Sequence, residues 1–389
     1  MIIKSYSEIF KEVVDIMRID SSTCRDMGAG PFCKYQCMIN DLMSRKQFVK
    51  VMKMYISEFS LPGHLKFTDA TMGNIDYKII REENCLRVTT SARDSLLKKD
   101  DIIIKIDGKS IIDTATENRV FLMNEPNDRQ TDLWWQILMF SSEVTVVRDY
   151  VQFDIPTVLS QDIIYDEEKY IYKITDNNRL YIRLADFYDD VAINDMLDEL
   201  KIYLEECEEL VIDVRGNGGG SSPAYSELLS YCFPDGKHEI KDYGFEINYT
   251  DRNCESRLRI FREFFGDNIG EELKDVLACE TNEILANKGK GFVKVAPDSN
   301  VIIGRKYPLK VLVYTDEGCC SAGESFVETV SQSDKVTIIG RPTMGINDYS
   351  NCTNAVWGDF YLAYPTSRDC RVDEGKGILG KGVPVDIRL

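Results

Sequence analysis

The sequence predicts a multidomain α/β (α+β) protein, and three observations point to this class. The chain has 389 residues, more than a single hydrophobic core usually supports. Residues 1–71 show apolar side chains at helical spacing, and residues 72–150 contain short β-like runs between turn signals. Residues 151–389 alternate short apolar strands with helical segments, which is typical of a sheet covered on its faces. We therefore expect three regions with these boundaries.

We expect the first region to begin with an amphipathic helix and not with a signal peptide. Its opening run, MIIKSYSEIFKEVVDIM, has no apolar segment followed by a small-residue cleavage site. A second helix is predicted over residues 46–59. No run in the chain reaches the ~18 apolar residues of a membrane span. We expect a cytoplasmic protein, although a secreted protein trimmed at its start would look the same.

The second and third regions have recognisable elements. A turn at Asp107-Gly108 predicts a hairpin in the β-rich region. In the third region the expected strands are residues 180–183, 210–214, 311–315 and 336–339. The expected helices are residues 191–206, 223–232 and 322–332. Residues 233–300 are polar and charged with interspersed aromatic residues, and we interpret them as an insertion or cap.

Charge and cysteine content exclude several functions. Lys+Arg 47 against Asp+Glu 65 gives a net charge of −18, which disfavours nucleic acid and membrane surfaces as partners. The twelve cysteines include no C-x-x-C pair, and His64 and His238 are the only histidines. A zinc site would lack its usual ligand spacing, so we expect no metal and no organic cofactor. We expect reduced thiols, most of them buried as small apolar side chains.

A glycine-rich loop follows one of the predicted strands. Residues 210–220 read LVIDVRGNGGG, so three glycines lie at the carboxyl end of a buried strand and before a helix. Glycines let backbone N–H groups converge on an anion, because no Cβ blocks a close approach. The string matches neither phosphate-loop pattern. Either it supplies donors to an oxyanion or it forms a tight structural turn.

Ser321 follows a second predicted strand and begins a helix. Residues 310–324 read KVLVYTDEGCCSAGE, with Glu324 three positions after the serine. One interpretation is a capping box, in which Ser321 and Glu324 satisfy the first amides of the helix. The other is a nucleophile at a sharp strand-to-helix turn, where the helix N-terminus can stabilise developing negative charge.

Together these two segments resemble the C-terminal processing (tail-specific) peptidases and their tricorn-core relatives. In that superfamily D-x-R-x-N-x-G-G precedes S-A-x-E, and the serine of the second motif is the nucleophile. Residues 338–345, IIGRPTMG, and residues 381–386, KGVPVD, are similar to two later motifs of the family. The resemblance implies a ClpP/crotonase-like core of stacked β and α layers. It also implies that Ser321 is the nucleophile, with an oxyanion hole formed by backbone amides of Gly218, Gly219 and Ala322. Glu324 would be structural.

The resemblance extends to the β-rich region. Residues 85–111 are similar to the second half of a PDZ domain, although Asp100-Asp101 stands where the family usually has Gly-Asp. A small β-rich domain without a peptide groove is the alternative. A PDZ-like domain would position a peptide by strand addition along its edge.

The base that activates Ser321 separates two branches of the superfamily. The tail-specific branch uses a lysine in T-x-G-K, and this chain has Ile346 at the position of that lysine. The tricorn-like branch uses a histidine near the N-terminus, in strings such as D-G-H. His64 matches that histidine within Pro62-Gly63-His64, with proline in place of the acidic residue. Histidine suits this role because it titrates near neutral pH. His238 lies in the polar insertion and is expected to be exposed to solvent.

One departure concerns the group that orients the histidine. Tricorn-like members place a glutamate before the closing motif, and Leu379 stands at that position here. Asp373 or Glu374 could substitute for the glutamate. The sequence predicts a serine endopeptidase that cleaves peptides or unstructured protein tails, with its oligomeric state open. The alternatives are a catalytically silent protein that binds a peptide or an apolar ligand, and a hydrolase of small esters or amides.

Overall fold

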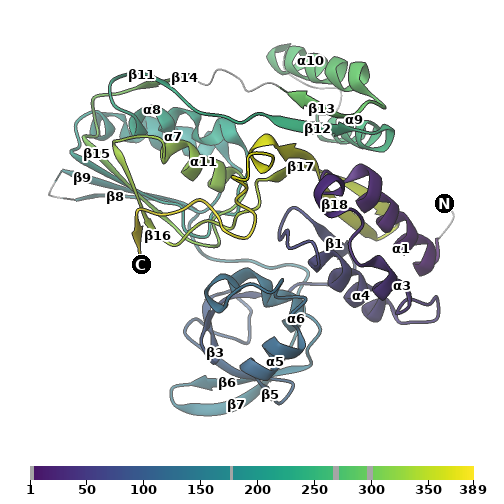
Figure 1. Cartoon of the computed structure of the whole chain (residues 1–389). Helices are drawn as coiled ribbons and strands as arrows, with labels where there is room; N and C mark the ends of the chain where they lie inside the picture. The colour runs from purple at the N-terminus through teal and green to yellow at the C-terminus, as the bar shows by residue number, and fades with distance from the viewer. Residues whose placement is uncertain (1–3, 176–177, 266–270, 296–300) are drawn as a thin grey trace. The chain divides into compact units, whose positions relative to one another are not determined.

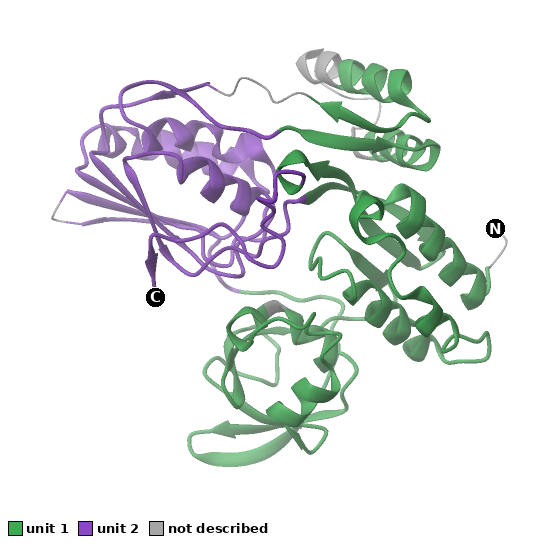
Figure 2. Cartoon of the chain, viewed as in Figure 1, with its two compact units in different colours: residues 1–165, 244–296, 349–372 green, residues 166–243, 297–348, 373–389 purple. Residues whose placement is uncertain are grey.

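The fold was analysed in a computed structural model, which describes residues 4–175, 178–265, 271–295 and 301–389. The chain forms two compact units, each made of three separate segments. Unit 1 comprises residues 1–165, 244–296 and 349–372, and unit 2 comprises residues 166–243, 297–348 and 373–389 (Figure 2). The α/β class predicted from the sequence is confirmed.

Unit 2 is built on a six-stranded sheet with the order β19-β16-β15-β10-β9-β8. Strands β9, β10, β15, β16 and β19 run parallel, and β8 pairs antiparallel with β9. The strands are β8 (Tyr170–Thr175), β9 (Arg179–Leu184), β10 (Glu209–Asp213), β15 (Lys310–Thr315), β16 (Val336–Gly340) and β19 (Ile387–Arg388). A separate ribbon pairs β11 (Gly236–Glu239) with β14 (Val301–Gly304).

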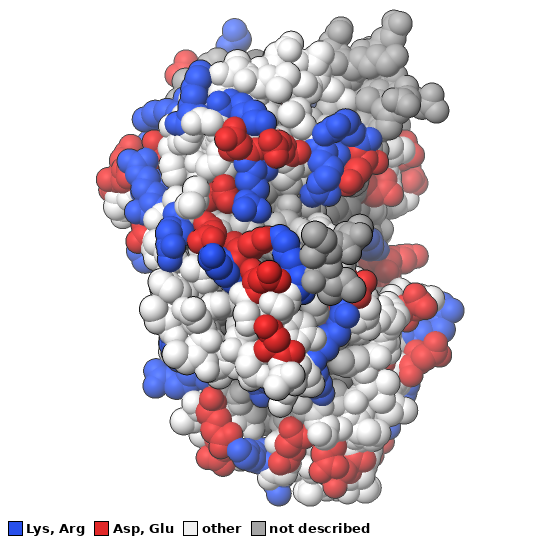
Figure 3. Space-filling model, turned by 90° about the vertical axis from the view of Figure 1, so that its right-hand side faces the viewer, with Lys and Arg blue, Asp and Glu red and all other residues white. Residues whose placement is uncertain are grey.

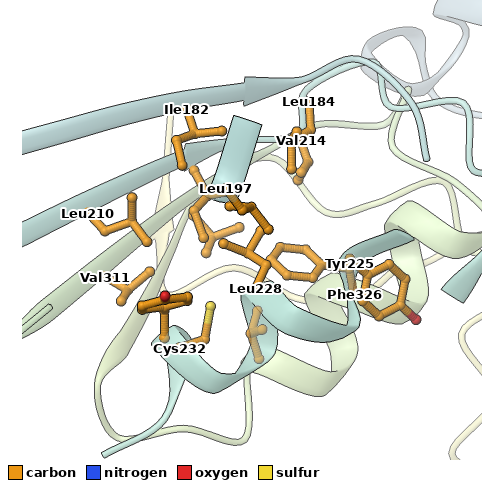
Figure 4. Packing of buried hydrophobic residues seen from close by; sticks show 14 of the residues in the cluster. Ile182, Leu184, Leu197, Leu210, Val214, Tyr225, Leu228, Cys232, Val311 and Phe326 are labelled. Atoms are coloured by element: carbon orange, nitrogen blue, oxygen red, sulfur yellow. The ribbon is translucent and has the colours of Figure 1, made fainter. Parts of the chain in front are cut away.

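Three helices pack on one side of this sheet, as Figure 1 shows. They are α7 (Asp190–Leu204), α8 (Ser226–Cys232), which follows the 3-10 turn Ser222–Tyr225, and α11 (Ala322–Val330). Their apolar residues meet those of the strands in one buried cluster (Figure 4), which includes Leu197, Leu228 and Phe326 opposite Leu210 and Val311. The sheet and its helices therefore match the elements predicted around the glycine loop and Ser321.

Unit 1 contains a second sheet that joins distant parts of the chain. Its order is β1-β18-β12-β13, with β17 paired to β18, and all pairs are antiparallel. The strands are β1 (Lys66–Asp69), β12 (Phe245–Tyr249), β13 (Gly291–Val295), β17 (Tyr349–Trp357) and β18 (Phe360–Asp369). The helices of this part are α1 (Tyr6–Asp15), α2 (Cys24–Met27), α3 (Phe32–Gln36), α4 (Arg45–Ser57), α9 (Asp251–Phe265) and α10 (Glu271–Asn287), with a π-helical turn at Ile16–Asp20 and a 3-10 turn at Cys370–Val372.

The β-rich region forms its own antiparallel sheet within unit 1. Its order is β2-β3-β4-β6-β7, with β5 paired to β4. The strands are β2 (Tyr77–Glu82), β3 (Cys85–Ser91), β4 (Ile102–Ile106), β5 (Lys109–Ser110), β6 (Glu143–Arg148) and β7 (Val151–Pro156), and the helices are α5 (Ile111–Glu117) and α6 (Trp135–Leu138), preceded by 3-10 turns at Asn127–Arg129 and Thr131–Leu133. Asp107 and Gly108 both have positive φ, 48° and 75°, as a tight two-residue hairpin requires.

The structure divides the chain differently from the boundaries expected at residues 71 and 150. Strand β18 pairs with both β1 and β12, so segments from both ends of the chain share one sheet. The predicted insertion over residues 233–300 does not form one cap, because β11 belongs to unit 2 whereas β12 and β13 extend the sheet of unit 1. Such long-range pairing leaves no local signal in the sequence.

On the face drawn in Figure 3, acidic and basic side chains are interspersed. The twelve cysteines are free thiols; five are buried, which is fewer than the sequence suggested. Within the described residues, no helix combines the length and the apolar character needed to cross a membrane. Nor does any group of three or more His, Cys, Asp or Glu side chains gather there as a metal site would require.

Candidate active site

Ser321 lies in the turn between β15 and α11 and has an unusual backbone conformation. Its φ is 53° and its ψ is −122°. These angles are close to the first central position of a type II′ turn, which glycine normally occupies. The N–H of Gly323 donates to the carbonyl of Cys320 at 2.9 Å and closes this turn. A serine held in this region costs about 1–3 kcal/mol, and such strain persists only where the surroundings impose it.

The helix that begins after Ser321 is not capped by the serine. The Ser321 side chain makes no capping hydrogen bond within the described part of the chain. The capping-box interpretation therefore does not describe this helix. Phe326 fixes the helix on the core, with ring centroids 5.5 Å from Tyr225 and 5.8 Å from Phe187.

Glu324 instead holds a loop that follows β16. Its side chain is fully buried and accepts four hydrogen bonds. One oxygen accepts from the Thr343 hydroxyl at 2.5 Å and from the amide of Gly345, and the other accepts from the amides of Ile346 and Asn347 at 2.9 Å each. Burial raises the pKa of Glu324, while these four donors act in the opposite direction. The carboxylate thus fastens residues 343–347 to the first turn of α11.

The glycine loop after β10 packs directly against Ser321. A Cβ added to Gly219, which has φ of +87°, would lie 2.6 Å from Ser321 Cβ and 3.1 Å from its Oγ. Asn217 is buried behind the loop, and its side chain bonds Leu184 O at 3.0 Å. The carbonyl of Asn217 accepts from the amide of Cys320 at 2.9 Å. The loop and the nucleophile turn are therefore one packed assembly.

The three amides predicted to form an oxyanion hole differ in their present partners. The amide of Gly218 donates to Ala185 O at 3.3 Å, and that of Gly219 donates to Asn217 Oδ1 at 2.9 Å. Both would have to give up these acceptors to bind a substrate oxygen. The amide of Ala322 is the first of α11, and it has no acceptor within the described residues.

Charged side chains also hold the two loops. Arg215 forms a bidentate ion pair with Asp213, at 2.6 and 2.9 Å. Although burial opposes it, this pairing lowers the pKa of Asp213. Asp316 Oδ1 accepts from the amides of Gly216 and Gly318, at 2.8 and 3.0 Å, and so ties the two loops together. Burial raises the pKa of Asp316.

His64 belongs to unit 1 and lies in the turn between α4 and β1. Its residue is 9% exposed, and its Nδ1 lies 2.7 Å from the carbonyl oxygen of Tyr349. A carbonyl can only accept, so Nδ1 carries the proton and the neutral ring has its lone pair on Nε2. Cys352 Sγ also contacts His64 O at 3.4 Å, so β17 holds both the ring and the backbone of this residue.

The second histidine has a different setting from the one predicted. His238 is half-buried on β11 instead of exposed. Its Nε2 lies 2.8 Å from Pro234 O, and its ring packs on Phe233 with centroids 5.3 Å apart. This ring is therefore engaged in a local contact. Ile346, at the position of the lysine used by one branch, is 1% exposed and packs as an apolar residue.

The residues considered as orienting groups lie near the C-terminus. The amide of Leu379 donates to the buried carboxylate of Asp348 at 2.9 Å. Asp373 and Glu374 are exposed, and Glu374 pairs with Lys376 at 2.7 Å. All of these lie in unit 2, whereas the acceptor that orients His64 is a backbone carbonyl of unit 1.

Two features of the site were not recognised in the sequence. The Asn347 side chain reaches back to the Ser321 carbonyl, and the Tyr349 carbonyl holds His64. The sequence offers a weak signal for Asn347, because it directly follows the T-x-G motif and Ile346. A backbone carbonyl leaves no signal of its own, since every residue has one.

Comparisons with known proteins identify a family and proteins of similar fold. The model of peptidase family S41 matches residues 178–389. A structure of mature CPAF complexed with lactacystin has a TM-score of 0.65 and 12% identity, covering 99% of this chain and 93% of that one. A second structure of mature CPAF gives a TM-score of 0.64 and 13% identity, with 99% and 92% covered. The photosystem II D1 C-terminal processing protease gives 0.46 and 15%, with 100% and 94% covered. A search of curated proteins returned no match.

The family match spans more than half of the chain, so this protein belongs to peptidase family S41. This confirms the superfamily predicted from the ordered motifs. Membership supports a serine-type peptidase as the class of enzyme. At 12–13% identity the CPAF structures show a shared fold.

Proposed function

We propose that this chain is a serine peptidase in which Ser321 is the nucleophile and His64 the general base. The observation that carries the proposal is the strained conformation of Ser321 in a turn fixed by Glu324, Asn217 and the glycine loop. Strain of this kind is maintained at functional sites. The strained turn therefore supports a functional role for Ser321.

The chemistry follows from the groups present. Ser321 Oγ attacks the substrate carbonyl while His64 Nε2 accepts its proton, and the imidazolium then protonates the leaving amine. The Tyr349 carbonyl keeps the Nδ1 proton in place throughout, a role that a carboxylate plays in other serine peptidases. The amide of Ala322 donates to the oxyanion. An amide of Gly218 or Gly219 adds a second donor by exchanging its internal acceptor.

The substrate class is also part of the proposal. Peptides or unstructured protein tails are the proposed substrates, cleaved internally. The β-rich sheet of unit 1 ends in strands β2 and β7, and an extended peptide could pair with such an edge. This would bring a disordered tail to the enzyme without requiring a specific side chain.

A fluorophosphonate probe tests the nucleophile. We expect the wild type to be labelled and Ser321→Ala to remain unlabelled. Labelling that survives Ser321→Ala would exclude Ser321 as the nucleophile. Intact mass of the labelled protein, followed by peptide mapping, identifies the modified residue.

The two histidines provide a matched pair for testing the base. Single-turnover acylation of His64→Ala should be slower by about 10²–10⁴-fold, the range that general base catalysis contributes. His238→Ala should behave as wild type, because its ring is engaged in a local contact on β11. Equal rates for the two variants would contradict the assignment of His64.

A catalytically silent binding protein is the second candidate. Leu379, where relatives place a glutamate, favours this alternative. It predicts that the wild type binds an unstructured peptide, measured by fluorescence anisotropy, yet neither cleaves it nor reacts with the probe.

A further inference from the structure

Asn347 connects the loop after β16 to the nucleophile turn. Its Nδ2 donates to Ser321 O at 2.8 Å and to Ser325 Oγ at 2.9 Å. Ser321 O is an acceptor only, so the amide nitrogen and not the amide oxygen must face it. The backbone of Asn347 is itself fixed, because its N–H donates to buried Glu324. The side chain therefore approaches Ser321 from a backbone that is itself held in place.

The bond to Ser321 O determines more than the position of one oxygen. The peptide unit between Ser321 and Ala322 is planar, and in a trans peptide the C=O and N–H point in opposite directions. Ser321 O also accepts from the amide of Ser325 at 2.9 Å. With the carbonyl held by these two donors, the direction of the Ala322 N–H is set as well. The ψ of Ser321, −122°, is the torsion that this arrangement fixes.

We propose that Asn347 is a positioning residue that aims the Ala322 amide at the oxyanion of the reaction. This inference rests on the proposed function of Ser321 and adds a residue to its machinery. Without the Asn347 donor, the Ser321 carbonyl loses one of the two donors that hold it and keeps the helical bond from Ser325, so the strained torsion of Ser321 can relax. The Ala322 amide would then point away from the position that the oxyanion occupies.

The effect should fall on the transition state. An oxyanion forms only as the carbonyl is attacked, so a misdirected donor lowers kcat and leaves KM nearly unchanged. Removing one oxyanion donor costs about 10²–10³-fold in kcat. Misalignment of a donor that is still present should lower kcat less, by about 10–100-fold.

The test replaces Asn347 by an isosteric group that cannot donate. Asn347→Asp keeps the shape, but its carboxylate only accepts and will repel Ser321 O. Asn347→Ala, the second variant, removes the donor without adding charge, in case the aspartate disturbs folding. Ser325→Ala is the matched control, because it removes the other partner of the same amide and leaves the bond to Ser321 O intact. Thermal unfolding establishes that each variant is folded.

Three measurements distinguish positioning from a structural role. We expect kcat on a fluorogenic peptide to fall about 10–100-fold in both Asn347 variants, with KM within about 3-fold. Affinity for a peptide aldehyde, which forms a tetrahedral adduct with the serine, should fall in parallel with kcat. For Asn347→Asp, the ratio of its kcat to that of wild type should rise as pH falls, because a protonated carboxyl regains a donor.

The outcomes separate this inference from the function on which it rests. If the wild type reacts with the fluorophosphonate and both Asn347 variants keep kcat within about 3-fold, the positioning role is excluded and the proposed function stands. A loss of kcat with unchanged aldehyde affinity, or an equal loss in Ser325→Ala, also excludes it. A wild type that does not react overturns the proposed function first, and this inference with it.

Discussion

The turn that contains Ser321 and the turn that contains His64 are supported in different ways. Ser321 has a strained backbone, and side chains of Glu324, Asn217 and Asn347 fix the segments around it. The ring of His64 donates from Nδ1 to the carbonyl of Tyr349. A strained residue needs several independent restraints, whereas an imidazole needs one acceptor to fix its tautomer. Substitutions around Ser321 should therefore lower reactivity and stability more than substitutions around the turn of His64.

Among substitutions of residues that support the two turns, Gly219→Ala should give the largest loss of reactivity. Its new methyl group would lie 2.6 Å from Ser321 Cβ, so the serine must move. A displacement of about 1 Å can cost 10²-fold in rate, so the fluorophosphonate labelling rate should fall at least that far. The second-order rate constant of labelling measures the loss.

Gly216→Ala is the control for backbone conformation. Gly216 also has a positive φ, +68°, but a Cβ there meets nothing within 4 Å. This variant should lose roughly 1 kcal/mol of stability and keep its labelling rate. Equal losses of labelling in both variants would show that the loop conformation matters, and not the contact with Ser321.

The second effect is on stability. Glu324→Gln keeps the volume of the side chain but turns an NH₂ group toward two of four donors. Each buried donor left without an acceptor costs about 1–3 kcal/mol, so for two donors we expect a loss of about 2–6 kcal/mol in the free energy of unfolding. Urea unfolding measures it, with Glu239→Gln on exposed β11 as the neutral control. An unchanged midpoint would mean that the loop 343–347 does not depend on this carboxylate.

A third, smaller effect concerns Lys53 on α4, in the unit that holds His64. Lys53 is 2% exposed, its Nζ lies 4.3 Å from the Trp135 ring centroid, and burial lowers its pKa to about 7. Below pH 7 the cost of the buried ammonium is fully present, and it disappears as pH rises toward the ordinary lysine value near 10.5. Lys53→Met should therefore stabilise by roughly 1 kcal/mol at pH 6.5 and by less at pH 9.5.

The urea unfolding midpoints of the wild type and of Lys53→Met, each measured at pH 6.5 and 9.5, test this prediction. A gain that is the same at pH 6.5 and 9.5 would show that better apolar packing, and not removal of a charge, stabilises the variant.

The smallest effect is expected for Tyr349→Phe. The phenol loses its bond to Asp26, 2.8 Å long, but the carbonyl that holds His64 is unchanged. The rate of acylation should stay within about 3-fold of that of the wild type, because a substitution of this kind changes the free energy by about 0.5 kcal/mol. A loss as large as that of His64→Ala would show that the tyrosine side chain positions the base, and the contrast between the two turns would be wrong.

Much of unit 2 could be predicted because its signals are local. Strands β9, β10, β15 and β16 are short apolar runs, and each differs from the predicted range by one residue at one or both ends. The ordered motifs identified the family. Local patterns can also be ambiguous, because S-x-x-E at Ser321 is as typical of a helix capping box as of a nucleophile motif. Only the fold brings Thr343 and Gly345 to Glu324 and so decides how that carboxylate is used.

The rest depends on contacts between distant residues or on backbone geometry. Pairing of β18 with β1 joins residues 360–363 to residues 66–69, and no periodicity reveals it. The positive φ of Ser321 is unexpected for a residue with a Cβ, so it could not be read from residue type. The partner of His64 is a backbone oxygen, which every residue offers.

The division of each unit into three segments has a consequence for biosynthesis. Unit 1 is incomplete until β18 has been made, and unit 2 until residues 373–389 have been made. During translation, therefore, neither unit can close until most of the chain has been added, and the loop of residues 343–347 emerges after Ser321. Asn217 and the glycine loop are made before Ser321, whereas residues 343–347 are made after it, so the turn of the serine gains its restraints in two stages.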